Sequence, residues 1–191
     1  MVLRYVVLIA SIWILAGCSE DSREGGGSAA IKPATPRGSG SALKFTAPAG
    51  WVSETPSSGM RKAQYTLPRV EADPEDAKMA VFFFEGQGGS VQANIDRWTG
   101  QFSKADGSPA TDAARVSKKE SHGIPLTIVD VSGTYKESMG PMTAMTPKPN
   151  FRMLAAVAET GSGPWFFKLT GPAKTLAKWE PSFHAFLDTI E

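Results

Sequence analysis

The sequence predicts an α+β domain in which a mainly antiparallel sheet of about seven strands packs against two main helices. Three observations support this prediction. Short segments rich in β-branched and aromatic residues are bounded by Gly or Pro. Two longer segments carry apolar residues along one face of an α-helix. Short turn signals, at His122-Gly123 and at residues 161–163, separate neighbouring strand segments, as in an antiparallel meander.

The expected strands cover residues 43–46, 60–67, 79–85, 115–121, 126–135, 151–159 and 165–170. The first helix is expected over residues 90–102, where the apolar stripe is Val91, Ile95, Trp98 and Phe102. Its first residue, Ser90, is a suitable N-cap.

The second helix is expected over residues 172–190, with Pro172 in its first turn. Its apolar stripe consists of Leu176, Trp179, Phe183, Leu187 and Ile190. Pro181 lies inside this segment and predicts a kink or a break. The order of three strands, helix, four strands and helix is typical of an α+β fold.

The N-terminus has the form of a secretory signal. Arg4 precedes an apolar run from Tyr5 to Gly17, which is too short to cross a bilayer that needs about 20 residues. The end of the run, Leu15-Ala16-Gly17-Cys18, resembles a bacterial lipobox. This resemblance implies that Leu15, Ala16 and Gly17 are recognised by the lipoprotein signal peptidase and that Cys18 carries diacylglycerol and further acyl chains such as palmitate. Under the alternative, Cys18 is an incidental thiol in a plain secretory peptide.

Three regions follow from this interpretation: a signal peptide over residues 1–17, a lipidated Cys with a flexible tether over residues 18–42, and one globular domain over residues 43–191. The tether consists mostly of Gly, Ser, Ala and Pro, and a flexible chain of its length reaches about 25–30 Å. Acyl chains would hold the protein in the bacterial cell envelope. Ser19 after the Cys resembles the pattern for export to the outer membrane, so the expected location is the periplasmic face of that membrane.

Composition excludes several classes of protein. The formal net charge of +1 excludes binding to nucleic acid driven by bulk positive charge. The single Cys excludes an internal disulfide framework and any zinc or iron–sulfur site built from Cys. The hydrophobic fraction of 41% and the charged fraction of 20% are those of an ordinary globular chain.

Several motifs of the globular region resemble those of an uncharacterised bacterial envelope family. They lie at residues 49–51 (AGW), 60–63 (MRKA), 86–89 (GQGG), 94–98 (NIDRW), 152–154 (RML) and 165–172 (WFFKLTGP). The predicted strand order is similar to the PsbP-like fold, an α/β/α sandwich. Members of that fold include the extrinsic photosystem II subunit, cyanobacterial lipoproteins and a Ran-binding import factor. The resemblance implies a binding or assembly role more than an enzymatic one.

Two sets of residues are candidates for binding an anion or a partner. Gly88, Gly89 and Ser90 follow an expected strand and open a helix, where backbone N–H groups could hold a phosphate or carboxylate; the alternative is a tight turn ending in an N-cap. The second set is basic: Arg152 and Lys168, with Arg97. If residues 161–163 close a hairpin, Arg152 and Lys168 are expected on one sheet face; the alternative is that their stems cover apolar surface while the charges stay in water.

Met139, Met142 and Met145 form a Met-x-x-Met-x-x-Met run in a Pro-rich loop over residues 139–145. Thioethers select Cu(I), so copper is a candidate cofactor with Met153 as a fourth ligand; Met also fills gaps over a core. The markers of nucleophilic hydrolysis are missing from the sequence. The leading hypothesis is therefore a lipid-anchored, non-enzymatic binding or assembly module with an envelope protein partner. A Cu(I)-binding protein and an undiscovered hydrolase or transferase are the alternatives.

Overall fold

The computed structural model describes residues 43–85, 88–136 and 146–191. Within them, eight strands form one antiparallel sheet in the order β1-β2-β3-β8-β7-β6-β4, and β5 also pairs with β6. The strands are β1 (Val52–Glu54), β2 (Arg61–Leu67), β3 (Ala77–Phe83), β4 (Phe102–Ser103), β5 (Arg115–Ser121), β6 (Ile124–Tyr135), β7 (Lys148–Thr160) and β8 (Gly163–Pro172). The fold class predicted from the sequence is confirmed.

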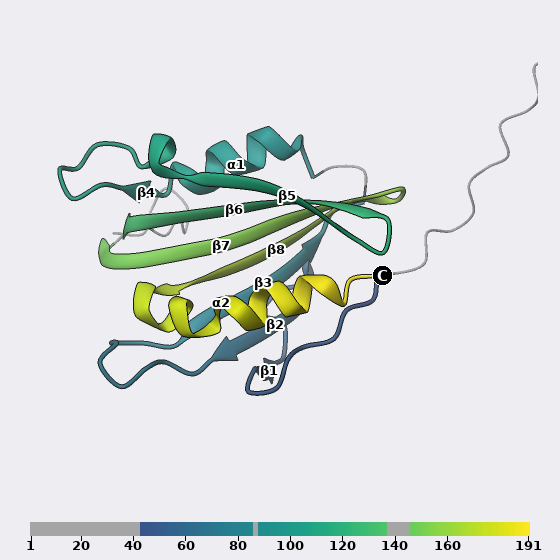
Figure 1. Cartoon of the computed structure of the whole chain (residues 1–191), viewed down its shortest axis with the longest axis horizontal. Helices are drawn as coiled ribbons and strands as arrows, with labels where there is room; N and C mark the ends of the chain where they lie inside the picture. The colour runs from purple at the N-terminus through teal and green to yellow at the C-terminus, as the bar shows by residue number, and fades with distance from the viewer. Residues whose placement is uncertain (1–42, 86–87, 137–145) are drawn as a thin grey trace, which may run out of the picture. The chain divides into compact units, whose positions relative to one another are not determined.

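Two α-helices lie on opposite faces of this sheet (Figure 1): α1 (Val91–Thr99) and α2 (Ala173–Asp188). A short 3₁₀ turn, Thr111–Ala113, precedes β5. Among the described residues, no helix is both long enough and apolar enough to cross a membrane.

The α2 face of the sheet is covered by a large aromatic core. Phe183 and Phe186 of α2 and Phe167 of β8 are fully buried there. The segment before β1 closes this core from the other side of α2. Trp51 stacks on Phe186 with ring centroids 5.1 Å apart, and its indole N–H donates to Ser182 Oγ at 3.1 Å. Together these rings form much of the core on this face of the sheet.

The α1 face is covered over only part of its width. Ile95 and Trp98 of α1 pack on β6, β7 and β8 in a second core. Phe82 and Phe84, at the end of β3 and just after it, are only partly buried at the margin of that core. The part of this face that β1, β2 and β3 form carries polar side chains instead.

Most of the expected elements are found with small shifts at their ends, and β5 has the predicted bounds. Residues 43–46 are not a strand: Lys44 exchanges two backbone hydrogen bonds with Glu191, of 2.9 and 3.1 Å. The short strand β1 was not expected. The first helix ends at Thr99, because Gly100 forms its C-cap, and Phe102 then joins the core from strand β4.

Pro181 does not break the second helix, which is continuous over 16 residues. Proline removes one backbone donor inside the helix. The packing of Leu176, Phe183 and Leu187, all fully buried, outweighs that loss. Pro172 is the N-cap residue rather than a residue of the first turn.

Candidate functional site

The candidate site is a small pocket where α1 meets β3 and β8. We call it the α1 pocket. Its volume is about 140 Å³, and it is lined by Phe82, Phe84, Arg97, Trp98, Gln101, Phe166 and Lys168. The walls are aromatic, and the polar groups are two cations and one amide. This pocket brings together two of the three basic residues that the sequence singled out, Arg97 and Lys168.

Helix α1 positions two wall residues because of its amphipathic spacing. Trp98 points to the sheet, where it is 4% exposed and meets Phe166 edge-on with ring centroids 6.0 Å apart. Arg97, one residue earlier, is rotated away from the core and is exposed. It lies in the last turn of the helix, where a cation also interacts favourably with the helix dipole.

Asn94 holds the Arg97 side chain in place. The Arg97 guanidinium donates to Asn94 Oδ1 at 2.6 Å. The Asn94 amide nitrogen in turn donates to the carbonyl oxygens of Gly88 and Ser90, at 2.7 and 2.9 Å. Asn94 is 4% exposed, so this buried amide connects the glycine loop to the cation. The sequence interpretation missed Asn94, although its i, i+3 spacing from Arg97 on a helix was a usable signal.

Gly88, Gly89 and Ser90 have structural roles at the start of α1, next to the α1 pocket. Ser90 Oγ accepts a hydrogen bond from Ala93 N at 3.1 Å, which confirms it as the N-cap of α1. A Cβ on Gly88 would lie 2.6 Å from Pro164 and 2.7 Å from Phe166, so a residue without a side chain is needed there. Gly89 has a φ of +73°, a conformation that favours glycine.

Lys168 projects from β8 on the same side of the sheet. Its ammonium donates to Gln101 Oε1 at 2.7 Å and lies 5.5 Å from the centre of the Tyr135 ring. Gln101 follows α1, so this bond ties the end of the helix to the sheet. Lys168 and Gln101 therefore form the polar rim of the pocket together with Arg97.

A polar strip continues from the pocket across the sheet. We define it as Arg61, Glu54, Gln64, Thr66 and Lys78. Strand pairing aligns Lys168 with Ala80, Ala80 with Gln64, and Gln64 with Glu54, so these four residues form one row on the α1 side. Ala80 has a short side chain, so the row dips between Lys168 and Gln64.

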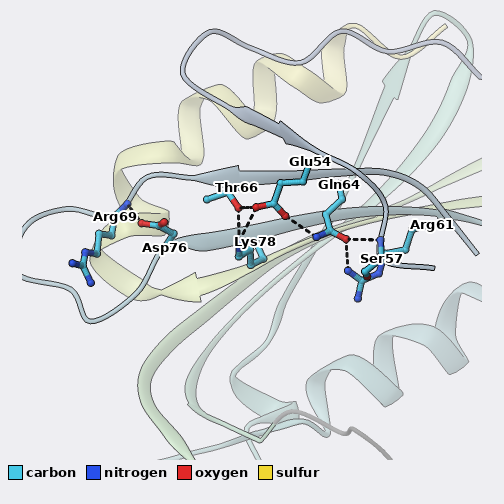
Figure 2. Close-up of polar contacts among 8 residues, drawn as sticks. All are labelled: Glu54, Ser57, Arg61, Gln64, Thr66, Arg69, Asp76 and Lys78. Atoms are coloured by element: carbon cyan, nitrogen blue, oxygen red, sulfur yellow. Dashed lines mark hydrogen bonds and ion pairs between the residues drawn. The ribbon is translucent and has the colours of Figure 1, made fainter. Parts of the chain in front are cut away.

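The side chains of the strip bind one another (Figure 2). Glu54 Oε1 accepts from Thr66 Oγ1 and from Lys78, and Glu54 Oε2 accepts from Gln64 Nε2 at 2.7 Å. Arg61 donates to Gln64 Oε1 at 2.6 Å and lies over the Phe82 ring of the pocket, 5.6 Å from its centre. Hydrogen bonds from Thr66, Gln64 and Lys78 lower the pKa of Glu54 to about 2. Glu54 is therefore ionised at neutral pH and paired with Lys78 at the far end of the strip.

The structure places Arg152 on the opposite face, so the expectation that Arg152 and Lys168 share a sheet face is wrong. Arg152 is aligned with Gly171 and Lys168 with Ala155. The turn between β7 and β8 has two residues, 161–162, because Thr160 pairs with Gly163. A three-residue turn at 161–163 would have put the two side chains on one face, and a change of one residue in register reverses every side chain.

On the α2 face, the buried Arg152 belongs to an ion network with two partly buried carboxylates. It binds Asp130 through two bonds of 2.8 and 2.9 Å and Glu180 of α2 through one of 2.7 Å. Hydrogen bonds that Arg152 donates to Asp130 outweigh burial and raise the pKa of Arg152. Burial raises the pKa of Asp130, but the bonds from Arg152 and Arg115 outweigh it and leave the pKa below its ordinary value. Arg152 thus joins β6, β7 and α2.

A larger hollow of about 760 Å³ lies at the N-terminus of α2, between the β2–β3 connection and the start of β7. Four prolines line it: Pro74, Pro147, Pro149 and Pro172. Three of its charged groups already have partners. Lys148 binds Glu75 at 2.6 Å, and Asp73 Oδ2 accepts from the backbone and side chain of Thr175 at 2.8 and 2.6 Å. These bonds stabilise the local fold.

Other candidates cannot be placed. Leu15, Ala16, Gly17, Cys18 and the run with Met139, Met142 and Met145 lie outside the described residues. Met153 is fully buried in the core under α1. Within residues 43–85, 88–136 and 146–191, no group of three or more His, Cys, Asp or Glu side chains could hold a metal ion.

Comparison with known proteins gives only structural likeness. No family model matches the chain, and no curated protein matches it. The solution structure of cyanobacterial PsbP (CyanoP) from Synechocystis sp. PCC 6803 is similar at a TM-score of 0.44 and 12% identity, covering 78% of this chain and 85% of that one. A Pseudomonas aeruginosa protein of unknown function, PA94, is similar at a TM-score of 0.45 and 13% identity, covering 66% of this chain and 78% of that one.

Proposed function

We propose that the protein is a lipid-anchored lipoprotein of the bacterial cell envelope that acts as a non-enzymatic binding module, with the α1 pocket as its binding site. The observation that carries the proposal is the composition of this pocket. Aromatic walls provide apolar contact, and the Arg97 and Lys168 cations stand at its rim. A concave apolar surface with a few converging polar groups is the usual form of a binding site.

The groups that surround the pocket suit binding rather than chemistry. Lys and Arg at the rim can hold an anion, whereas proton transfer near neutral pH needs a group whose pKa lies close to the working pH. The seven lining residues, all in the described part of the chain, include no His, Cys, Asp, Glu or Ser. The pocket therefore offers recognition of shape and charge.

The anchor is the second half of the proposal, and it rests on the sequence. The Leu15-Ala16-Gly17-Cys18 motif and the Gly- and Ser-rich residues that follow it suit a domain held near a membrane. A Cys18→Ser variant should lose lipidation. We expect it to leave the detergent phase in which the wild-type protein partitions, and equal partition of the two forms would contradict the anchor.

Site-directed photo-crosslinking in cells tests the binding role. A benzoylphenylalanine is placed at Glu85, which is exposed and follows the pocket residue Phe84, and a control probe is placed at the exposed Lys118 of β5. We expect a partner adduct from position 85 that is absent from position 118 and that Arg97→Gln removes. Identical adducts from both positions, or adducts that Arg97→Gln leaves unchanged, would contradict the α1 pocket as the binding site.

A further inference from the structure

We propose that the α1 pocket binds an acidic segment of a partner protein. One bulky apolar side chain of that segment enters the pocket, and carboxylates on either side of it bind Arg61 and Arg97. This inference rests on the proposed function, since it names the chemistry of the partner. The observation that carries it is a pair of arginines that approach the same aromatic walls from two sides.

The two arginines come from different elements. Arg61 begins β2, and its guanidinium lies over the Phe82 ring, 5.6 Å from the centre. Phe82 lies on β3, aligned with Arg61 on one side and with Phe166 of β8 on the other. Arg97 lines the pocket from the last turn of α1, next to Trp98. The aromatic walls therefore have one guanidinium on the β2 side and one on the α1 side.

Both guanidiniums are held in position by a side-chain amide. Arg61 donates to Gln64 Oε1 and Arg97 donates to Asn94 Oδ1, each at 2.6 Å. Within the described part of the chain neither arginine is in an ion pair, whereas Arg152 binds two carboxylates. An arginine has five N–H donors, so one bond to an amide leaves others to meet a ligand. A cation held in advance loses less conformational freedom when that ligand arrives.

The surroundings of these arginines favour a ligand that brings its own carboxylates. The seven described residues that line the pocket include no Asp or Glu. Glu54, the one carboxylate of the polar strip, is paired with Lys78 at 3.0 Å. Asp96, the residue before Arg97, accepts instead from Gln92 at 2.7 Å. Guanidinium N–H groups can meet both oxygens of a carboxylate, so an Asp or Glu of the partner suits each arginine.

The size of the pocket indicates a single side chain between those carboxylates. Sites for drug-sized molecules and cofactors have volumes of about 300–1,000 Å³. The α1 pocket has about 140 Å³. An aromatic side chain would contact Phe82 and Phe84, which are partly buried, and would lie in front of Trp98 and Phe166, which are almost fully buried.

The separation of the arginines predicts the spacing of the segment. Arg61 on β2 and Phe166 below α1 are two strands apart, or about 10 Å at about 4.8 Å per strand. In an extended chain, residues i−2, i and i+2 point to the same side, and i−2 and i+2 are about 13 Å apart. We therefore expect the pattern acidic-x-aromatic-x-acidic, with the aromatic residue in the pocket.

The test is fluorescence anisotropy with the full chain as cells process it, purified in nonionic detergent. The probe is fluorescein-Gly-Ser-Asp-Ser-Phe-Ser-Asp-Ser-Gly with an amidated terminus. Three matched probes replace both Asp by Asn, replace Phe by Ala, or have the same composition with both Asp directly beside Phe. The protein variants are Arg61→Gln, Arg97→Gln and, as a control with the same charge change on β5, Lys118→Gln, each checked by circular dichroism.

We expect saturable binding of the first probe. The Asn probe, Arg61→Gln and Arg97→Gln should each weaken it about tenfold or more, the effect of losing a charged hydrogen bond, and Lys118→Gln should leave it unchanged. The Ala probe and the probe with adjacent Asp residues should also bind more weakly. Absence of saturable binding, equal binding of the Asp and Asn probes, or equal binding of the two probes of the same composition would overturn the inference.

The crosslinking experiment separates this inference from the proposed function. A partner captured at Glu85 in an adduct that Arg97→Gln removes, together with equal binding of the Asp and Asn probes, would refute only the acidic segment. Adducts that Arg97→Gln leaves unchanged would refute the α1 pocket itself as the binding site.

Discussion

The two faces of the sheet use positive charge differently. On the α2 face, Arg152 is buried and is bound by two carboxylates, Asp130 and Glu180. On the α1 face, Arg97 and Lys168 bond to the side-chain amides of Asn94 and Gln101. The carboxylates neutralise the Arg152 charge within the fold, whereas the Asn94 amide holds the Arg97 guanidinium in position.

This difference follows from what covers each face. Helix α2 and the segment before β1 cover one face with aromatic rings, so any charge there must be paired to be tolerated. Helix α1 is shorter and covers only part of the other face, so Arg97 in its last turn is exposed to water. We infer that the α2 face maintains the fold and the α1 face is available for binding.

The largest expected effect is the loss of Arg152. Arg152→Gln removes the cation from a buried network and leaves Asp130 with only Arg115, so we expect a loss of about 3 kcal/mol in the free energy of unfolding. Arg97→Gln, which removes an exposed cation, should change that free energy by no more than about 0.5 kcal/mol. Urea denaturation measures both. Similar losses of unfolding free energy in the two variants would contradict the proposed difference between the two faces.

Gly88→Ala should have the next largest effect. The new Cβ would clash with Pro164 and Phe166, and overpacking of this kind costs about 1–3 kcal/mol. Gly59→Ala is the matched control, because no atom lies within 4 Å of its Cβ position. Thermal unfolding of both variants gives the comparison. If Gly88→Ala were as stable as Gly59→Ala, the close packing of the loop against the pocket wall would be refuted.

The N-cap of α1 should have a smaller effect. Ser90→Ala removes the acceptor for Ala93 N, and the expected loss is about 1 kcal/mol of unfolding free energy. Ser90→Asp keeps an acceptor and should restore most of the stability. Chemical denaturation of the two variants tests this. Equal stability of the Ala and Asp variants would show that the cap does not stabilise α1.

The smallest effect concerns pH and the polar strip. Glu54 has a pKa of about 2 against an ordinary value of 4.5. Its stabilising contribution is therefore complete above about pH 4.5 and decreases as the pH falls toward 2. We expect the stability difference between the wild type and Glu54→Gln to shrink over this range. A difference that stayed constant from pH 6 to pH 2 would contradict the bonds to Thr66, Gln64 and Lys78.

Patterns of local sequence predicted most of the fold. The period of two along the strands, the stripe of α1 and the Ser90 cap depend on neighbouring residues, and each is found in the structure. The errors in predicting the helices arise where two neighbouring residues favour different structures. Phe102 fits the helical stripe, but Gly100 ends the helix first, and Pro181 is retained because the packing of α2 is strong.

The site was only partly predictable because it depends on register. Arg97 and Lys168 were identified by residue type, and their positions on α1 and β8 bring them together. Arg152 was grouped with them because the length of a turn, two residues or three, cannot be decided from Gly161-Ser162-Gly163 alone. Phe82 and Phe84 lie at the end of β3 and just after it, Gln101 follows α1, and only the folded sheet places them beside Trp98.

The sharpest test of the α1 pocket as the binding site follows the tryptophan indole N–H signals of the ¹⁵N-labelled full chain while the partner captured by crosslinking at position 85 is added. Trp98 lines the α1 pocket, whereas the indole N–H groups of Trp51 and Trp179 donate to Ser182 and to the Pro68 carbonyl on the other side of the sheet. We expect a saturable shift of the Trp98 signal while the signals of Trp51 and Trp179 stay in place. An unmoved Trp98 signal, or equal shifts of all three, would contradict the α1 pocket as the binding site.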